Sequence, residues 1–221
     1  MDSIYEQILD VSKEHLKDLL NRTGSILYSS FHTLKKGEYY LVGINPGGSG
    51  GQTVGEHIEQ LPKQESNAYN EQWERGRSGK LYGPGQHPLQ KRLRSIFREL
   101  GVELDDVCAS NIVFFKSREV KELNNINDLA EDCWPVHQVI LKVVRPKYIL
   151  TFGALPFSIF SQELKFVSLQ PTDSGHGNWV IRTARSEDGQ QFLVGLPHLS
   201  RYSPPRGKIR DVIKNLKQPD Y

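Results

Sequence analysis

A strand that ends in a glycine-rich turn, residues 39–51, constrains the fold of this chain more than any other stretch. Its first six residues, Tyr-Tyr-Leu-Val-Gly-Ile, carry no charge, which is typical of a strand covered on both faces. Pro46 cannot continue a central strand, and four of the five residues after it are glycine, so the backbone can turn sharply and approach a ligand closely. Asn45 is the polar side chain at the carboxyl end of this strand, where open α/β sheets bind their ligands.

The remaining apolar segments predict strands that alternate with helices. The predicted helices are 3–22, 89–100, 129–144, 155–160 and 207–217. The predicted strands are 39–44, 107–115, 147–152, 179–184 and 192–196. Ser3 and Glu6 have the spacing of a capping box at the start of the first helix. This order predicts an α/β fold with three α/β/α layers around a doubly wound, mainly parallel four-stranded sheet.

Chain length and composition predict one globular domain. The 221 residues suffice for a sizeable core, and 37% hydrophobic and 24% charged residues are typical of a soluble protein. We expect residues 1–221 to form a single domain, with an N-terminal helical extension (1–36) and a long active-site loop (52–86). Two cysteines give no disulfide framework, and the first residues lack the character of a signal peptide. We therefore expect a cytoplasmic protein, or a nuclear one in a eukaryote, with no membrane partner.

Basic side chains cluster near the carboxyl end of the chain. The net charge of +2 argues against a protein coated in nucleic acid, but residues 201–217 contain six lysines or arginines and one aspartate. A localised positive face can follow phosphates without raising the overall charge much. Solvated helix faces would give the same pattern, so both interpretations stay open.

Polar side chains near three strand ends are the candidates for chemistry. Asn45 ends the first strand, Asn111 lies inside the second, and His198 follows the last. Asn111 can equally be a buried amide satisfied by neighbouring backbone, and a lone loop histidine such as His198 is more often structural or exposed. The glycine turn lacks the Lys-Ser/Thr ending of a P-loop and the spacing of a dinucleotide fingerprint, so it does not predict ATP or NAD binding.

Cys133 and His137 are four residues apart on a predicted helix, which is the spacing of half a metal site. No second pair at ligand spacing accompanies them in the sequence. Core packing is therefore the favoured interpretation, and we expect neither a metal nor another cofactor.

Five segments, in matching order, resemble the uracil-DNA glycosylase superfamily. Gly-Ile-Asn-Pro-Gly at residues 43–47 is similar to the first active-site motif of its mismatch-specific members, and Ser-Asn-Ile-Val at 110–113 to the strand with the base-reading asparagine. Tyr-Gly at 82–83 matches the place of an aromatic residue that stacks on the extruded base. Residues 133–154 are similar to a helix–strand–glycine segment of the iron–sulfur-type members, and Pro-His-Leu-Ser at 197–200 resembles the second motif.

The resemblance implies a DNA base-excision glycosylase that acts as a monomer on uracil- or damage-containing DNA. It assigns catalysis to Asn45, which orients water, and to His198, which donates a hydrogen bond to the departing base. The residues that it places around the base are Gly43, Ile44, Pro46, Gly47, Tyr82 and Asn111. The residues that it places against DNA are Gly48, Ser49, Ser200, Arg201, Tyr202 and Ser203. Arg201 or Tyr202 would fill the gap left by the flipped nucleotide.

The chain departs from the superfamily at two places. Leu199 stands where the second motif normally has proline, in the loop expected to press on DNA. Only Cys133 matches an iron–sulfur ligand, Phe115 stands at the position of another, and no cysteine precedes residue 108, so no cluster is expected.

Two other functions fit the same residues. A catalytically silent, glycosylase-like module that binds damaged DNA or a nucleobase is favoured by the substituted second motif and the modest net charge. A nucleotide-handling enzyme would use the glycine turn as a phosphate loop, and a mononucleotide would then stabilise the fold more than DNA does.

Overall fold

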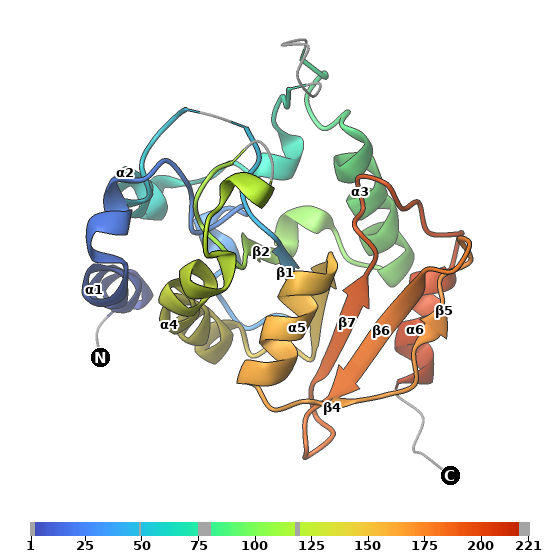
Figure 1. Cartoon of the computed structure of the whole chain (residues 1–221). Coiled ribbons are helices and arrows are strands. Elements are labelled where there is room, and N and C mark those ends of the chain that lie inside the picture. The colour runs from blue at the N-terminus through green and yellow to red at the C-terminus, as the bar shows by residue number, and fades with distance from the viewer. Residues whose placement is uncertain (1–2, 49, 75–80, 118–119, 217–221) are drawn as a thin grey trace.

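The computed structural model describes residues 3–48, 50–74, 81–117 and 120–216. In this part of the chain seven strands form one mixed sheet (Figure 1). The strands are β1 (Tyr39–Gly43), β2 (Cys108–Asn111), β3 (Tyr148–Phe152), β4 (Val167–Ser168), β5 (Thr172–Asp173), β6 (Val180–Arg185) and β7 (Phe192–Leu196). Their order is β2-β1-β3-β7-β6-β4, with β5 paired to β6.

The sheet is larger than the expected four strands and is mixed. The four neighbours β2, β1, β3 and β7 are parallel, and they are the part that the alternation of strands and helices predicts. Antiparallel β6 adds to β7, and the short strands β4 and β5 pair with β6. Two-residue strands carry no periodic signal of their own, which is why the sequence did not predict β4 and β5.

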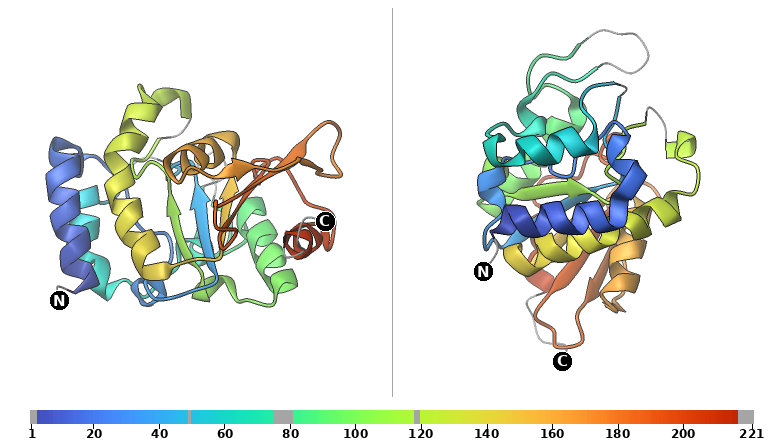
Figure 2. Two further views of the ribbon diagram at one scale, coloured as in Figure 1. Left: turned by 90° about the horizontal axis from the view of Figure 1, so that it is seen from below. Right: turned by 90° about the vertical axis from the view of Figure 1, so that its left-hand side faces the viewer.

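Helices cover both faces of the sheet. They are α1 (Ile4–Leu16), α2 (Val54–Gln60), α3 (Pro88–Leu100), α4 (Ile126–Val144), α5 (Ala154–Glu163) and α6 (Lys208–Asn215). Side chains alternate along β1, so Tyr40 and Val42 pack with α1, α4 and α5 on one face, while Tyr39 and Leu41 pack with α3 and α6 on the other. The left panel of Figure 2 shows this layering, with α1 outside α4. No described helix is both long and apolar enough to cross a bilayer.

Residues 52–86 are only partly the loop that their polar composition predicted. They contain α2, a 3₁₀ turn at Leu61–Lys63 and another at Ala68–Asn70. Thr53 and Glu56 form a capping box at the start of α2, and Val54 and Ile58 are buried in the core. That capping box is a sequence signal for the helix. Residues 75–80 of the expected loop lie outside the described part of the chain.

The N-terminal extension covers the outer edge of the sheet. Beyond α1, whose Ser3–Glu6 capping box is present as expected, residues 23–29 run antiparallel to the chain of β2 and the residues after it. Backbone N–H groups of Ser25 and Tyr28 donate to the carbonyl oxygens of Phe114 and Ala109 at 2.9 and 2.8 Å. The extension thereby completes the sheet edge, and it brings the hydroxyl of Tyr28 near Asn111, the last residue of β2.

Candidate functional site

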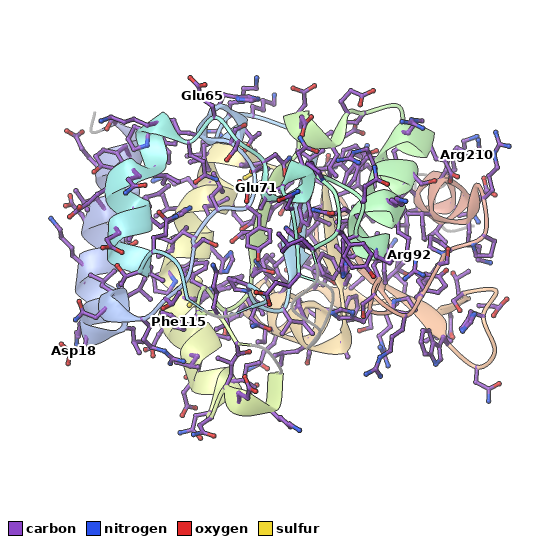
Figure 3. The ribbon with its side chains drawn as sticks, turned by 90° about the horizontal axis from the view of Figure 1, so that it is seen from above. Asp18, Glu65, Glu71, Arg92, Phe115 and Arg210 are labelled. Carbon is purple, nitrogen blue, oxygen red and sulfur yellow. The ribbon has the colours of Figure 1, made fainter. Side chains whose placement is uncertain are left out.

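The candidate residues gather at the carboxyl ends of β1, β2, β3 and β7, because these four neighbouring strands are parallel. In Figure 1 β7 points towards the top of the molecule, and Figure 3 looks down on that end. Asn45 lies two residues beyond β1, Asn111 is the last residue of β2, and His198 lies two residues beyond β7. This edge is where the topology of an open α/β sheet predicts a ligand site.

The amide group of Asn45 is fixed by two hydrogen bonds. Its Nδ2 donates to the carbonyl oxygen of Pro46 at 2.8 Å and to the Oγ of Ser117 at 2.9 Å. A carbonyl oxygen can only accept, so the atom that faces Pro46 must be the nitrogen, which fixes the orientation of the amide. Oδ1 of Asn45 has no hydrogen bond within the described chain. It is the end of this side chain that remains for a ligand or a water molecule.

Asn111 is buried, and its amide nitrogen has no hydrogen-bond partner among the described residues. Its Oδ1 lies against the α carbon of Gly43, where a Cβ would overlap with Oδ1 and would approach the Cζ of Phe152 to 2.7 Å. Glycine at position 43 therefore leaves the space that the asparagine and the Phe152 ring occupy. Buried polar atoms of other side chains, among them Ser12 and Tyr69, share this condition, and the Asn111 amide lies close enough to the Tyr28 hydroxyl to lower the pKa of that phenol. A buried NH₂ group without a full hydrogen bond is costly.

His198 is held in one tautomer by the residue two positions after it. The backbone N–H of Ser200 donates to Nδ1 at 3.2 Å, and the Ser200 hydroxyl lies 2.7 Å from the same atom and can donate to it as well. With Nδ1 as the acceptor of both, the neutral ring carries its proton on Nε2. Burial, and then the positive charge of Arg201, lowers the pKa of His198. The ring is therefore neutral at neutral pH and offers Nε2–H as a donor. It packs edge-on against Phe152, with ring centroids 5.8 Å apart.

Phe152 is the link between the candidate side chains. Its ring lies beside Gly43 on one side and the His198 ring on the other. It ends β3, and Gly153 after it packs against Ile44 and His198. The structure thus brings Gly43, Asn111 and His198 around the ring of Phe152, which no sequence pattern had singled out.

The loop after His198 differs from expectation at two positions. Leu199 is fully buried beneath α3, where Arg92 donates to its carbonyl oxygen at 2.5 Å, so this leucine anchors the loop from inside. Tyr202 is also fully buried, and its hydroxyl donates to the carbonyl oxygen of Ser174 at 2.8 Å. Its expected contact with DNA is therefore wrong for this conformation, because a side chain without exposed surface cannot reach a phosphate or fill a gap in a duplex.

Other residues of the same loop are exposed. Ser200, Arg201 and Ser203 lie on the surface, and the backbone N–H groups of Arg201 and Tyr202 both donate to the carbonyl oxygen of His198. Of the two residues expected to fill a gap in DNA, the exposed one is Arg201.

The glycine turn is contacted by Lys116, a residue that was not among the predicted site residues. Gly48, Gly50 and Gly51 have φ angles of 92°, 70° and 95°, which side chains rarely adopt. The Nζ of Lys116 donates to the carbonyl oxygen of Gly50 at 3.1 Å. Lys116 and Ser117 directly follow the predicted strand 107–115, so their position after a strand was a usable signal. Ser49, expected to contact DNA, lies outside the described residues.

A row of aromatic rings forms a wall beside the site. Tyr28 lies 6.3 Å from Trp73 between ring centroids, Trp73 lies 5.2 Å from His87, and His87 lies 5.0 Å from Tyr82. Tyr69 packs between Tyr28 and Trp73 from beneath, at 5.6 and 5.8 Å. Tyr82, the aromatic residue expected at the base, therefore stands at the far end of this row.

Tyr28 stands at the near end of the row. Its hydroxyl lies near the backbone of Gly47 and the side chain of Asn111. Burial raises the pKa of Tyr28 far above its ordinary value, against the opposing effect of Gly47, so the hydroxyl stays protonated. The ring next to Asn111 is thus supplied by the N-terminal extension, for which the sequence indicated only packing.

Two side chains of α3 clamp the aromatic wall. Buried Gln90 donates to the carbonyl oxygens of Ala68 and Glu71 at 3.3 and 3.0 Å. One turn later, Arg94 donates to the carbonyl oxygens of Tyr69 and Gly85 at 3.1 and 3.2 Å. Residues 68–73 and 85–87 are therefore attached to a helix of the core, and the rings keep their positions before a ligand arrives.

Cys133 and His137 lie in the hydrophobic core. Tyr40 bonds to Nδ1 of His137 at 2.8 Å, and the rings of Phe114, Trp134 and Phe160 surround the imidazole. Burial lowers the pKa of His137 to about 4 and raises that of the Cys133 thiol. No group of three or more His, Cys, Asp or Glu residues in the described ranges is arranged to hold a metal.

Neither a protein-family model nor a curated protein sequence matches this chain. The function of the site therefore has to be inferred from its geometry and from the motifs that it contains.

Proposed function

We propose that this protein is a DNA glycosylase that hydrolyses the N-glycosidic bond of uracil, or of a related deaminated or mismatched base. The observation that carries the proposal is the buried Nδ2 of Asn111, which has no partner in the described chain. An amide presents a donor and an acceptor side by side, and the Watson–Crick edge of uracil presents the complementary pair. Such a base reaches a recessed amide only after it has left the DNA stack.

His198 stabilises the leaving base in this mechanism. Negative charge develops on the base as the glycosidic bond lengthens, and the Nε2–H of a neutral imidazole can donate to the carbonyl oxygen that collects it. One preorganised donor of this kind contributes about 3–4 kcal/mol to a transition state. The lowered pKa of His198 and its fixed tautomer support this role.

Asn45 orients the attacking water. Its Oδ1 is free while both N–H bonds are used, so the side chain can accept a hydrogen bond from water but cannot remove a proton at neutral pH. Catalysis therefore relies on stabilisation of the leaving base and of the cationic sugar. The predicted rate is lower than that of a site with aspartate at this position.

DNA contacts surround these three residues. Lys116 at the glycine turn and the exposed Arg201 offer positive charge on either side of the site. The ring next to Asn111, Tyr28, offers an aromatic face for the extruded base in place of Tyr82.

The test is base release from defined oligonucleotides. Purified protein is incubated, without added metal, with single- and double-stranded DNA that contains uracil, hypoxanthine or a mismatch, and abasic sites are detected by alkaline cleavage. The proposal predicts abasic sites at one or more of these bases. Absence of base release from the whole panel would rule out the enzyme.

The runner-up function is a catalytically silent module that binds damaged DNA. It was favoured by Leu199 in the second motif, but the burial of that leucine keeps His198 in place, which removes one reason to expect inactivity. Selective binding of uracil-containing DNA without base release would identify the silent module. Stabilisation by a mononucleotide in preference to DNA would instead favour a nucleotide-handling enzyme.

A further inference from the structure

The turn between β5 and β6, residues 174–179, lies at the same end of the sheet as the candidate site, where the parallel strands have their carboxyl ends. Because β6 is antiparallel to β7, β6 begins where β7 ends. The buried Tyr202 joins the two segments, since its backbone N–H donates to the carbonyl oxygen of His198 and its hydroxyl donates to that of Ser174. Figure 1 shows the turn after β5 beside the loop that follows β7.

This turn presents an exposed tryptophan on a rigid support. Trp179 keeps 38% of its surface exposed, and only Leu81 and Val167 are comparable large apolar side chains within the described residues. Its ring centroid lies 4.9 Å from that of His176 and 6.3 Å from that of Tyr202. The turn is closed by Ser174 N–H to the carbonyl oxygen of Trp179 at 3.1 Å and by Trp179 N–H to that of His176 at 3.2 Å. The tryptophan is therefore held in place by its neighbours. Because much of the ring is exposed, packing in the core does not explain why a tryptophan stands at this position.

The charges near the turn suit a polyanion. The neighbouring segment 199–206 contains the exposed Arg201 and Arg206 and no acidic residue, and its Pro205 packs against Gly175 of the turn. Asp173 is the acidic residue at the start of the turn, and it is exposed to solvent. Aromatic rings between basic side chains are the arrangement with which proteins bind single-stranded nucleic acid, since bases stack on the rings while cations follow the phosphates.

We propose that Trp179, supported by His176 and Tyr202, is a stacking platform for an unpaired base next to the extruded nucleotide. The inference rests on the proposed function in that the strand is DNA, and it extends that function by naming the substrate as single-stranded or locally unpaired DNA. In a duplex the neighbouring base is stacked and paired, so its face is not available to Trp179.

Binding of lesion-free DNA tests the platform separately from base excision. The affinity of a fluorescently labelled thymidine homopolymer, and of the same strand in a duplex, is measured by anisotropy for the wild type, Trp179→Ala and Trp179→Phe. Trp179→Ala is expected to weaken single-strand binding by about 5- to 140-fold, the range for one stacked base, and duplex binding by less than about twofold. Trp179→Phe retains a ring and should keep most of the affinity.

Val167→Ala is the control, because Val167 is an even more exposed apolar side chain (55% against 38% for Trp179) and lies on β4, on another part of the sheet. Unchanged affinity in Trp179→Ala, an equal loss for single strand and duplex, or an equal loss in Val167→Ala would each overturn the inference. So would a wild type that does not bind the single strand. Loss of single-strand binding in Trp179→Ala by a protein that releases no base would keep the platform and refute the glycosylase.

Discussion

Replacement of Asn111 by leucine should stabilise the fold while it removes base recognition. Leucine has the same branching as asparagine, with methyl groups in place of the amide oxygen and nitrogen. A buried donor without a partner costs about 1–3 kcal/mol, and the substitution removes that cost. The same change removes the hydrogen bonds to the base, so turnover should fall by at least about tenfold.

Asn45 provides a control of the same residue type, for which the same substitution is expected to change the free energy of unfolding in the opposite direction. Its amide nitrogen makes two hydrogen bonds, to Pro46 and Ser117, each worth roughly 0.5–1.5 kcal/mol, so Asn45→Leu should lower the free energy of unfolding by about 1–3 kcal/mol. For a chain of this size 1 kcal/mol shifts the melting temperature by about 2–4 °C. The two variants should therefore melt on either side of the wild type, about 4–24 °C apart.

The assay is thermal denaturation of the three proteins in one buffer without DNA, followed by base release from the best substrate. If Asn111→Leu melts as low as Asn45→Leu, the Asn111 amide is satisfied within the fold and is not reserved for a base. If Asn111→Leu is stabilised but keeps full activity, the buried amide has no part in recognition.

Three further predictions address the catalytic donor, the buried histidines and the glycine turn. His198→Ala should lower turnover by about 10²–10³-fold with little change in DNA affinity, as measured by single-turnover kinetics and anisotropy, and equal losses in both would show a loop-shaping role only. Burial lowers the pKa of His57 and His137 to about 4, so the unfolded chain, with its ordinary value near 6.5, takes up protons first as the pH falls. Stability is then present above about pH 6.5 and is lost towards pH 4, by about 2 kcal/mol per histidine at pH 5; melting curves should show this loss, and His137→Phe should reduce it by the share of one histidine. Lys116→Ala should reduce the slope of log affinity against log salt by about 0.7–0.9, one phosphate contact, and leave the chemical step unchanged; an unaltered slope would remove Lys116 from the DNA interface.

The parallel part of the sheet was predictable because its signals are local. The uncharged run 39–44 followed by Pro46 and glycines specifies a buried strand and its turn, and β1 ends at Gly43 as a result. The apolar run 107–115 correctly predicted a strand but overestimated its length, since β2 ends at Asn111. Its second half is buried, yet it lies beyond the ladder with β1 and is covered by the extension through Ser25 and Gly24. A buried segment is equally apolar whether or not it is a strand of the ladder, so composition could not show where β2 ends.

The walls of the candidate site were not predictable, because they arise from contacts distant in sequence. Tyr28 reaches Asn111 across 83 residues only because the extension pairs with β2. Trp73 joins it only because Gln90 and Arg94 hold its segment on α3. Tyr202 looked exposed among serines and prolines, yet a phenol whose hydroxyl finds a buried carbonyl oxygen can be fully covered.

The segment 23–29 has a consequence for aggregation. β2 is the last strand at its end of the sheet, and an uncovered edge offers unpaired N–H and C=O groups to a second molecule. Here the chain closes that edge with its own backbone, and the same segment carries the ring that stands beside Asn111. Detachment of this segment, by proteolysis at the turn after α1 or by a substitution that weakens its pairing, would remove the ring beside Asn111 and expose an unpaired strand edge in a single event. Loss of base recognition and self-association should therefore appear together.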